Sequence, residues 1–224
     1  MSLQVAGTKI RGPKGEYCTE CEPLVEAKQQ KAEEERREKA RIFRAKNITE
    51  ILSRSGVPKR YLPCSFDNFE GPRPKRCPSF IYGPPGVGKT HLAVAILREA
   101  LIDKGQNHGK FVRTVDLFKE IRHSFDEQAT DSEMAILRTY GQQIPLLVID
   151  DMGAEKVTEW VLQTLYDLID RRYVEELPTI ITSNLSLEGL ERHYGTHGNR
   201  LGSRILAMGG IYEITGRDRR ISGK

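Results

Sequence analysis

A glycine-rich segment behind a short apolar strand restricts the fold of this chain more than any other part of the sequence. Residues 83–90 match the pattern G-x-x-x-x-G-K-[ST], between a predicted strand at Ser79–Tyr82 and a predicted helix over residues 88–104. Glycines let backbone N–H groups surround phosphate oxygens, and the following helix points its positive end at the same anion. The segment therefore predicts a phosphate-binding loop, in which Lys89 reaches the β- and γ-phosphates of a nucleotide and Thr90 binds Mg²⁺.

Two carboxylates follow the next strongly apolar strand. Leu146–Ile149 is wholly apolar, and Asp150 and Asp151 come directly after it. Ligands of open α/β sheets bind at the carboxyl ends of the strands. We therefore expect Asp150 to hold Mg²⁺, through water, and Asp151 to orient or deprotonate an attacking water. The alternative is a solvated strand end that carries two incidental acids.

The chain beyond the loop alternates short apolar strands with helices. Further strands are predicted at Lys110–Val115, Thr179–Thr182 and Gly210–Ile214, and further helices over residues 116–125, 132–140 and 157–176. Wholly apolar strands that alternate with helices are typical of a parallel sheet covered on both faces. The sequence thus predicts an α/β fold of three layers.

The N-terminal part has a different composition. Residues 1–23 contain several glycines and prolines, and residues 24–46 are a run of charges in which acids precede bases by four positions, as in Glu33 and Arg37. This spacing favours an exposed helix. We therefore predict a short helical extension at residues 1–46 and one α/β domain at residues 47–224.

Composition narrows the class of protein. The 35 basic and 31 acidic residues leave a net charge of +4, which is compatible with nucleic-acid binding but does not establish it. The longest apolar run, Leu92–Leu97, is far shorter than the roughly 20 residues of a transmembrane helix. The N-terminus lacks the pattern of a secretory signal, and four cysteines are too few for a disulfide scaffold. We therefore expect a cytoplasmic protein.

Later polar residues extend the predicted site. Asn184 follows the predicted strand at Thr179–Thr182, and it can bond the γ-phosphate or the attacking water if that strand lies beside the strand of Asp150. Alternatively, Asn184 only ends the strand and caps a turn. Arg200 and Arg204 are four residues apart on a predicted helix, so they share a face. They could reach the γ-phosphate of a neighbouring subunit, or simply be solvated.

Together these segments resemble an AAA+ ATPase, and more narrowly the DnaC/DnaI type of helicase loader in the DnaC/IstB-like family. The resemblance covers roughly residues 50–224. The segments that carry it are Gly83–His91, Leu146–Gly153, Thr182–Leu185, Arg200–Arg204 and a lead-in made of Ser55–Pro58 and Cys64–Phe69. A generic P-loop kinase is not expected to combine all of them.

The resemblance implies an AAA+ P-loop NTPase core with a five-stranded parallel sheet and no large C-terminal lid, which binds ATP or ADP with Mg²⁺. The nucleotide-binding residues that it implies are Gly83, Pro84, Pro85, Gly86, Val87, Gly88, Lys89, Thr90, His91 and Arg220. Arg220 is preferred over Arg217 and Arg219 as a sensor-2-like residue. The implied Mg²⁺ residues are Thr90 and Asp150.

The resemblance also implies the catalytic residues and the partners. Asp151 would be the second Walker B acid, Asn184 the sensor 1 residue, and Arg204 an arginine finger acting in trans, with Arg200 as its competitor. The chain would form an ATP-dependent homo-oligomer. It would bind a replicative hexameric helicase and single-stranded DNA during the initiation of DNA replication.

The chain departs from the family pattern at two places. The second Walker B acid is Asp151 rather than Glu, and its shorter side chain suits slow, switch-like hydrolysis. Cys18 and Cys21 resemble half of a zinc knuckle, but structural zinc usually takes four Cys or His ligands. Cys64 and Cys77 lie inside the ATPase lead-in and are poor candidates to complete the set, which argues against zinc in this chain.

The segment between the second and third predicted strands is a candidate nucleic-acid surface. Basic residues follow a phosphate backbone and aromatic faces stack on bases. The basic residues are Lys110, Arg113, Lys119, Arg122, His123 and Arg138, and the aromatic residues are Phe118, Phe125 and Tyr140. Alternatively, Phe118, Ile121 and Phe125 are spaced as a core stripe and the basic residues are a solvated face.

Three other functions remain open at this point. A transposition helper ATPase of the IstB type shares the core but acts on duplex DNA and a transposase. A small-molecule P-loop kinase would need a lid of arginines and an acceptor pocket, for which the sequence has no signal. A nucleotide-dependent adaptor without hydrolysis is compatible with the shorter Asp151.

Overall fold

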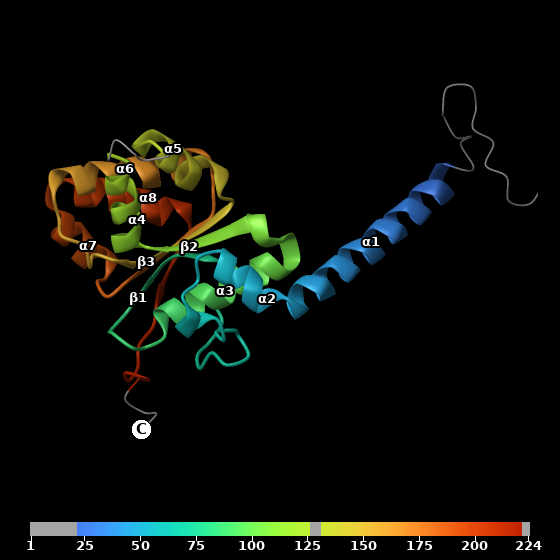
Figure 1. Cartoon of the computed structure of the whole chain (residues 1–224). Helices are drawn as coiled ribbons and strands as arrows, with labels where there is room; N and C mark the ends of the chain where they lie inside the picture. The colour runs from blue at the N-terminus through green and yellow to red at the C-terminus, as the bar shows by residue number, and fades with distance from the viewer. Residues whose placement is uncertain (1–21, 126–130, 221–224) are drawn as a thin grey trace, which may run out of the picture. The chain divides into compact units, whose positions relative to one another are not determined.

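The computed structural model describes residues 22–125 and 131–220 (Figure 1). The chain divides into an N-terminal unit at residues 1–43 and a compact unit at residues 44–224. The described part of the first unit belongs to helix α1 (Glu22–Lys46), where the charge pattern predicts a helix. Arg37 of α1 pairs with Glu33 one turn earlier at 2.5 Å, as the acid-first spacing favours. The predicted functional boundary after residue 46 stays a prediction.

Five parallel strands form one sheet in the order β2-β3-β4-β1-β5. The strands are β1 (Pro78–Tyr82), β2 (Gly109–Arg113), β3 (Leu146–Met152), β4 (Thr179–Ser183) and β5 (Gly210–Glu213). All strands are parallel, so their carboxyl ends meet at one edge of the sheet. This arrangement confirms the predicted α/β fold class.

Helices cover both faces of the sheet (Figure 1). The helices are α2 (Ile48–Arg54), α3 (Lys89–Lys104), α4 (Thr114–His123), α5 (Glu133–Arg138), α6 (Glu159–Val174), α7 (Leu187–Tyr194) and α8 (Gly198–Met208). Core residues of α2 and α3 pack with Val148 of β3, and those of α4 to α8 pack with Ile149, because successive strand side chains point to opposite faces. The predicted three layers are therefore present.

Short helical turns join these elements. Three are 3₁₀ turns, η1 (Lys59–Tyr61), η2 (Gln106–His108) and η4 (Gly195–His197), and η3 (Thr139–Gln143) is a π-helical turn. In the described residues, no helix is both long enough and apolar enough to cross a membrane.

Several predicted boundaries differ from the structure for local reasons. The strand predicted to reach Val115 ends at Arg113, and α4 begins at Thr114, whose hydroxyl donates to the backbone oxygen of Asp150 at 3.1 Å. The strand predicted to end at Ile149 continues to Met152, whose carbonyl accepts a bond from the Ser183 hydroxyl at 2.6 Å. A long-range hydroxyl bond to the backbone of β3 thus lies at both boundaries.

The predicted helix over residues 132–140 is interrupted. It ends at Arg138 and continues as the π-helical turn η3, because the buried Arg172 takes the carbonyl oxygens of Tyr140 and Ile144 at 2.6 and 2.9 Å. The predicted helix over residues 157–176 begins later, since Thr158 caps its first turn by accepting from the amide of Val161.

Candidate nucleotide-binding site

The predicted phosphate-binding loop lies between β1 and α3, at the carboxyl edge of the sheet. Gly83, Gly86 and Gly88 have φ values of 150°, 79° and 108°, which side chains rarely tolerate. A Cβ atom at Gly83 would also collide with the carbonyl oxygen of Ile214. The glycines of the pattern are therefore required by the backbone path of this loop.

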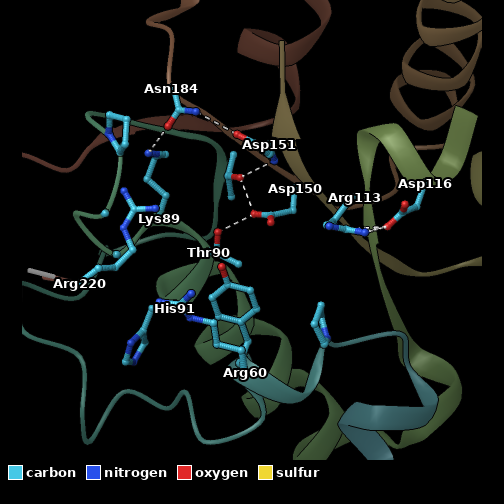
Figure 2. A pocket seen from close by; sticks show the side chains of 16 residues that line it. Arg60, Lys89, Thr90, His91, Arg113, Asp116, Asp150, Asp151, Asn184 and Arg220 are labelled. Carbon is cyan, nitrogen blue, oxygen red and sulfur yellow. Dashed lines mark hydrogen bonds and ion pairs between the residues drawn. The ribbon is translucent and has the colours of Figure 1, made fainter. Parts of the chain in front are cut away.

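A pocket of about 630 Å³ opens beside the loop (Figure 2). Of the predicted residues, it is lined by Pro85, Gly86, Gly88, Lys89, Thr90, His91, Asp150, Asp151, Asn184 and Arg220. Gly83 and Pro84 belong to the loop without lining the pocket, and Val87 is buried in the core. The parallel sheet thus gathers residues from the loop after β1, from β3 and from the position just after β4, as the sequence predicts.

Lys89 is buried at the first turn of α3, with 7% of its surface exposed. Its ammonium donates to the carbonyl oxygens of Gly83 and Pro84 and to Oδ1 of Asn184, each at 2.8 Å (Figure 2). Burial lowers the pKa of Lys89, while the nearby carboxylates of Asp151 and Asp150 oppose this effect. A cation on the wall of an open pocket can exchange these neutral acceptors for an anion.

Asp150 is the last residue of the continuous buried run of β3, and its Oδ1 accepts two hydroxyl bonds. Thr90 donates at 2.8 Å and Thr182 at 2.7 Å. Burial raises the pKa of Asp150, and the two hydroxyl bonds oppose this rise. A buried carboxylate beside the Thr90 hydroxyl is a set of hard oxygen donors, which Mg²⁺ prefers. Thr90 and Asp150 therefore fit a magnesium ion that accompanies a nucleotide.

Asp151 turns out of the strand into the pocket. Its φ of 59° is unusual for a residue with a side chain, and its exposed carboxylate accepts from Nδ2 of Asn184 at 3.0 Å. The amide of Asn184 thus bridges Lys89 and Asp151 (Figure 2). This bridge links the phosphate-binding loop with the acid that the sequence places beside the attacking water.

The hydroxyl residues that hold the two acids were not predicted from the sequence. Thr182 receives the amide of Asp151 at 3.0 Å while it donates to the Asp150 carboxylate, and Thr114 bonds the backbone oxygen of Asp150. The run Thr182-Ser183 at the end of a buried strand was the signal for this role, since buried hydroxyls need partners. No sequence signal indicates Thr114, because its contact depends on the pairing of β2 with β3.

Residues outside the predicted set also line the pocket. Pro58, Arg60 and Tyr61 come from the lead-in around η1, and Arg113 with Asp116 forms an exposed ion pair at 2.5 Å at the end of β2. His91 lies 3.0 Å from the carbonyl oxygen of Ser65 through its Nε2. The lead-in segment is therefore part of the pocket as well as of the core.

The three C-terminal arginines occupy different places. Arg220 lines the pocket and its guanidinium bonds Asp218 at 2.6 Å. The backbone amide of Arg219 donates to the carbonyl oxygen of Gly86 at 3.1 Å, and its side chain turns to the carbonyl oxygen of Glu70. Arg217 is exposed and does not line the pocket. Arg220 is thus the one of these three that faces the nucleotide pocket.

Comparisons with known proteins give the family. The model of the IstB-like ATP binding protein family matches residues 79–217, which includes the loop, both acids and Asn184. The chain belongs to the IstB-like ATP-binding family. Most of the residues that line the pocket thus lie in the part of the chain that matches this family of ATP-binding proteins.

The relatives of this chain include a helicase loader and an ATP-binding protein of an insertion sequence. The chain is 30% identical over 151 residues to the replicative helicase loader DnaI of Bacillus subtilis, covering 63% of this chain and 47% of that protein. It is 33% identical over 125 residues to the ATP-binding protein of insertion sequence IS5376 from Geobacillus stearothermophilus, covering 56% and 44%. The chain thus spans about half the length of these two relatives.

A solved structure supports the same grouping. The crystal structure of the DnaC helicase loader superposes with a TM-score of 0.58 at 28% identity, over 70% of this chain and all of that one. The IstB-like core of this chain is therefore similar in fold and sequence to an AAA+ helicase loader.

Arg200 and Arg204 lie outside the pocket of this IstB-like domain. Both are on α8, where Arg200 is exposed. The Arg204 guanidinium bonds Asp170 of α6 at 2.7 Å and lies 4.7 Å from the centre of the Tyr173 ring. Neither side chain lines the pocket of its own chain, so a role at the γ-phosphate requires a neighbouring copy and stays a prediction.

The candidate nucleic-acid segment is only partly core. Phe118, Ile121 and Tyr140 are buried, which agrees with the alternative that aromatic residues there belong to the core. The expectation that Phe125 completes the core stripe is wrong, since it is 57% exposed. Phe125 lies 5.9 Å from the ring of Trp160, over which Arg122 sits at 5.3 Å.

The predicted half of a zinc knuckle, Cys18 and Cys21, lies outside the described residues. Cys64 is buried and Cys77 is exposed, and both are free thiols. Within residues 22–125 and 131–220, no group of three or more His, Cys, Asp or Glu side chains has the arrangement of a metal site.

Proposed function

We propose that this chain is an ATP-dependent loader of a replicative DNA helicase, which binds ATP with Mg²⁺ and hydrolyses it slowly. The observation that carries this proposal is the bridge of Asn184 between Lys89 and Asp151, beside the Thr90–Asp150 pair. The bridge connects a phosphate-binding cation with a water-orienting acid, as an ATPase requires. The loader role is supported by the similarity to DnaI and DnaC.

The chain's own residues divide the work of hydrolysis. Magnesium, when bound, neutralises charge on the phosphates. The backbone amides of the loop and the Lys89 ammonium bind phosphate oxygens. Asp151 accepts a proton from the attacking water, and Asn184 keeps the Asp151 carboxylate aimed into the pocket. Because Asp151 is shorter than Glu, its base lies farther from the water, which suits slow turnover.

Assembly of several copies would complete the site. Arg204 and Arg200 lie on α8, where a second chain can approach them. In a homo-oligomer, one of these guanidinium groups stabilises charge on the γ-phosphate bound by the neighbour, with Arg204 as our preferred finger. Arg204 must then give up or share its part-buried bond to Asp170, and such an ion pair near the surface contributes little to stability.

Single-stranded DNA is the proposed nucleic-acid partner. Exposed Phe125, partly exposed Trp160 and the Arg122 guanidinium form one cluster, and Lys119 lies on the same helix as Arg122. Such a combination of an aromatic face and cations fits unpaired bases and their backbone better than duplex DNA. A helicase loader acts on chromosomal DNA, so the proposal places the chain in the cytoplasm.

The direct test is co-purification with a hexameric replicative helicase. We expect capture of the helicase by the wild-type chain to depend on whether ATP with Mg²⁺ is present. Lys89→Ala should abolish this dependence, while Lys104→Ala, an exposed lysine at the other end of α3, should keep it. Capture that is absent in all conditions, or equal with and without ATP for the wild type, would contradict the proposal.

A transposition helper of the IstB type is the second candidate. It is favoured by the family model and by the similarity to the IS5376 protein. The two functions differ in the DNA that they bind. Tighter ATP-dependent binding to duplex than to single-stranded oligonucleotides, with no capture of a helicase, would favour the transposition role.

A further inference from the structure

The last two residues of β3, Asp151 and Met152, form with Gly153 a turn whose backbone path needs support. Asp151 and Gly153 both have positive φ values, 59° and 92°. A side-chain residue keeps such a conformation only when the surroundings hold it. Since Asp151 is the acid that faces the pocket, whatever fixes this turn also fixes the direction of its carboxylate.

Bonds from β4 hold the first half of this turn. The amide of Asp151 donates to Thr182, and the carbonyl of Met152 accepts from Ser183. The second half is held by a different group. The amide of Gly153 donates to Oε2 of Glu155 at 3.0 Å.

Glu155 is a buried carboxylate that no part of the proposed chemistry uses. Glu155 is 8% exposed and Tyr194 is 2% exposed. Oε1 of Glu155 accepts a hydrogen bond from the hydroxyl of Tyr194. Both donors are neutral groups. One bond connects the buried carboxylate to the turn, and the other connects it to helix α7. A buried carboxylate is costly unless such bonds satisfy it.

Tyr194 connects the acidic turn with the helix pair α7 and α8. It is the last residue of α7, and α7 packs tightly on α8, since a Cβ at Gly198 or Gly202 would collide with Glu191. Helix α8 carries the two candidate arginine fingers. The bonds from Tyr194 to Glu155 and from Gly153 to Glu155 therefore join the C-terminal end of α7 to the turn that bears Asp151.

We propose that Glu155 is a positioning residue for Asp151, and that Tyr194 holds Glu155 in place. The inference rests on the proposed ATPase function, because it assigns Asp151 as the base that Glu155 positions. Loss of this support lets the turn leave its left-handed conformation, and the Asp151 carboxylate then loses its aim. Nucleotide binding by the loop does not depend on the turn and is retained.

The test compares two buried tyrosines that are alike except for their partners. Tyr194→Phe removes the bond to Glu155, and Tyr140→Phe removes a similar bond, from a tyrosine that is also 2% exposed, to Glu120 at 2.8 Å. Glu155→Ala removes the whole support. Glu155→Gln keeps an oxygen for Gly153 and an amide group for Tyr194, so it should restore most of the function.

Amide hydrogen exchange of Gly153 in the nucleotide-free protein is the first measurement. We expect roughly tenfold faster exchange in Glu155→Ala, a smaller increase in Tyr194→Phe, and no change in Tyr140→Phe. Steady-state ATP hydrolysis is the second. We expect kcat to fall about 10- to 100-fold in Glu155→Ala, and several-fold in Tyr194→Phe, with KM within about twofold of wild type.

Two results would overturn the proposal. One is unchanged Gly153 exchange and unchanged kcat in Tyr194→Phe, which decides the matter if Glu155→Ala does not fold. The other is an equal loss in Tyr140→Phe, which would mean that both tyrosines act only through stability. If the wild-type chain does not hydrolyse ATP, the proposed function fails instead, and the exchange comparison still tests whether Glu155 holds the turn.

Discussion

Lys89 and Arg172 are both buried cations, yet they are held in different ways. Lys89 lines an open pocket, and its ammonium bonds three oxygens, of which Oδ1 of Asn184 belongs to a residue that also lines the pocket. The Arg172 guanidinium is fully enclosed, with 0% exposure, and it has five acceptors. These are the Thr179 hydroxyl and the carbonyl oxygens of Tyr140, Ile144, Pro145 and Pro178.

The difference separates a binding group from a structural anchor. Burial lowers the pKa of both, and that of Arg172 falls to about 10. The partners of Arg172 come from η3 and from the starts of β3 and β4, so the guanidinium ties these segments together. The partners of Lys89 can be replaced by water or by phosphate oxygens. A buried cation thus serves binding when it lines an open pocket, and folding when it is fully enclosed.

The same substitution should change the stability of the fold far more at Arg172 than at Lys89. Arg172→Met removes a donor from four carbonyl groups, of which that of Pro178 also accepts from the amide of Leu147, so we expect the free energy of unfolding to fall by about 3–5 kcal/mol. Lys89→Met should change it by less than about 1 kcal/mol, because Lys89 lines the pocket and water that enters there can take the place of its ammonium. Urea unfolding followed by circular dichroism measures both. Equal losses would show that the two cations do not differ in kind.

Removal of the bridge should affect turnover more than binding. Asn184→Ala deletes the bonds to Lys89 and Asp151, so we expect kcat for ATP hydrolysis to fall about 10- to 100-fold with little change in the dissociation constant for ATP. Asn107→Ala, at an exposed asparagine in η2, is the matched control and should be neutral. A loss of ATP binding in Asn184→Ala with kcat intact would reverse the assigned role.

The ionised Asp150 carboxylate should lower the free energy of unfolding at neutral pH. Its pKa in the folded state is raised, so the folded chain binds more protons than the unfolded one, and this contribution to stability is lost as the pH rises through the raised pKa. We expect the free energy of unfolding of Asp150→Asn to be about 1 kcal/mol higher than that of the wild type at pH 7, and this part of the pH dependence to disappear. Asp151→Asn, at an exposed carboxylate, should stay within about 0.5 kcal/mol of wild type. A less stable Asp150→Asn protein would contradict this.

The smallest expected effect concerns the proposed DNA surface. Replacing Lys119 and Arg122 with glutamine should weaken single-stranded DNA binding a few-fold, with ATP binding unchanged. The slope of the logarithm of the binding constant against the logarithm of the salt concentration should become shallower by about 1–2. Lys104→Gln with Arg76→Gln changes two other exposed basic residues and is the control. Unchanged binding at low salt in the Lys119 and Arg122 variant would remove this surface from the account.

The sequence predicts the pocket well because its signals are local. Lys89, Thr90 and the two acids are defined by short patterns at strand ends, and parallel pairing then brings them to one edge. Asn184 was predicted only on the condition that its strand lies beside β3, which the sheet order meets.

Other features depend on contacts that the sequence does not encode locally. The Tyr194–Glu155 bond joins residues 39 positions apart, and the anchor of Arg172 reaches Tyr140 over 32 positions. Phe125 fits a helical core stripe by spacing, but α4 ends at His123, so this position lies beyond the helix and points outward. The arginines of α8 could be placed on a helix but not in a site, since their proposed target is on another copy.

The most direct test of the central claim is a calorimetric titration of the chain with ATP in the presence of Mg²⁺. Wild-type protein should show saturable binding of one nucleotide per chain, and Lys89→Met should weaken it at least about 100-fold while the protein remains folded. No heat of binding for the wild type at millimolar ATP, or equal affinity in the two proteins, would contradict the assignment of this pocket to a nucleotide.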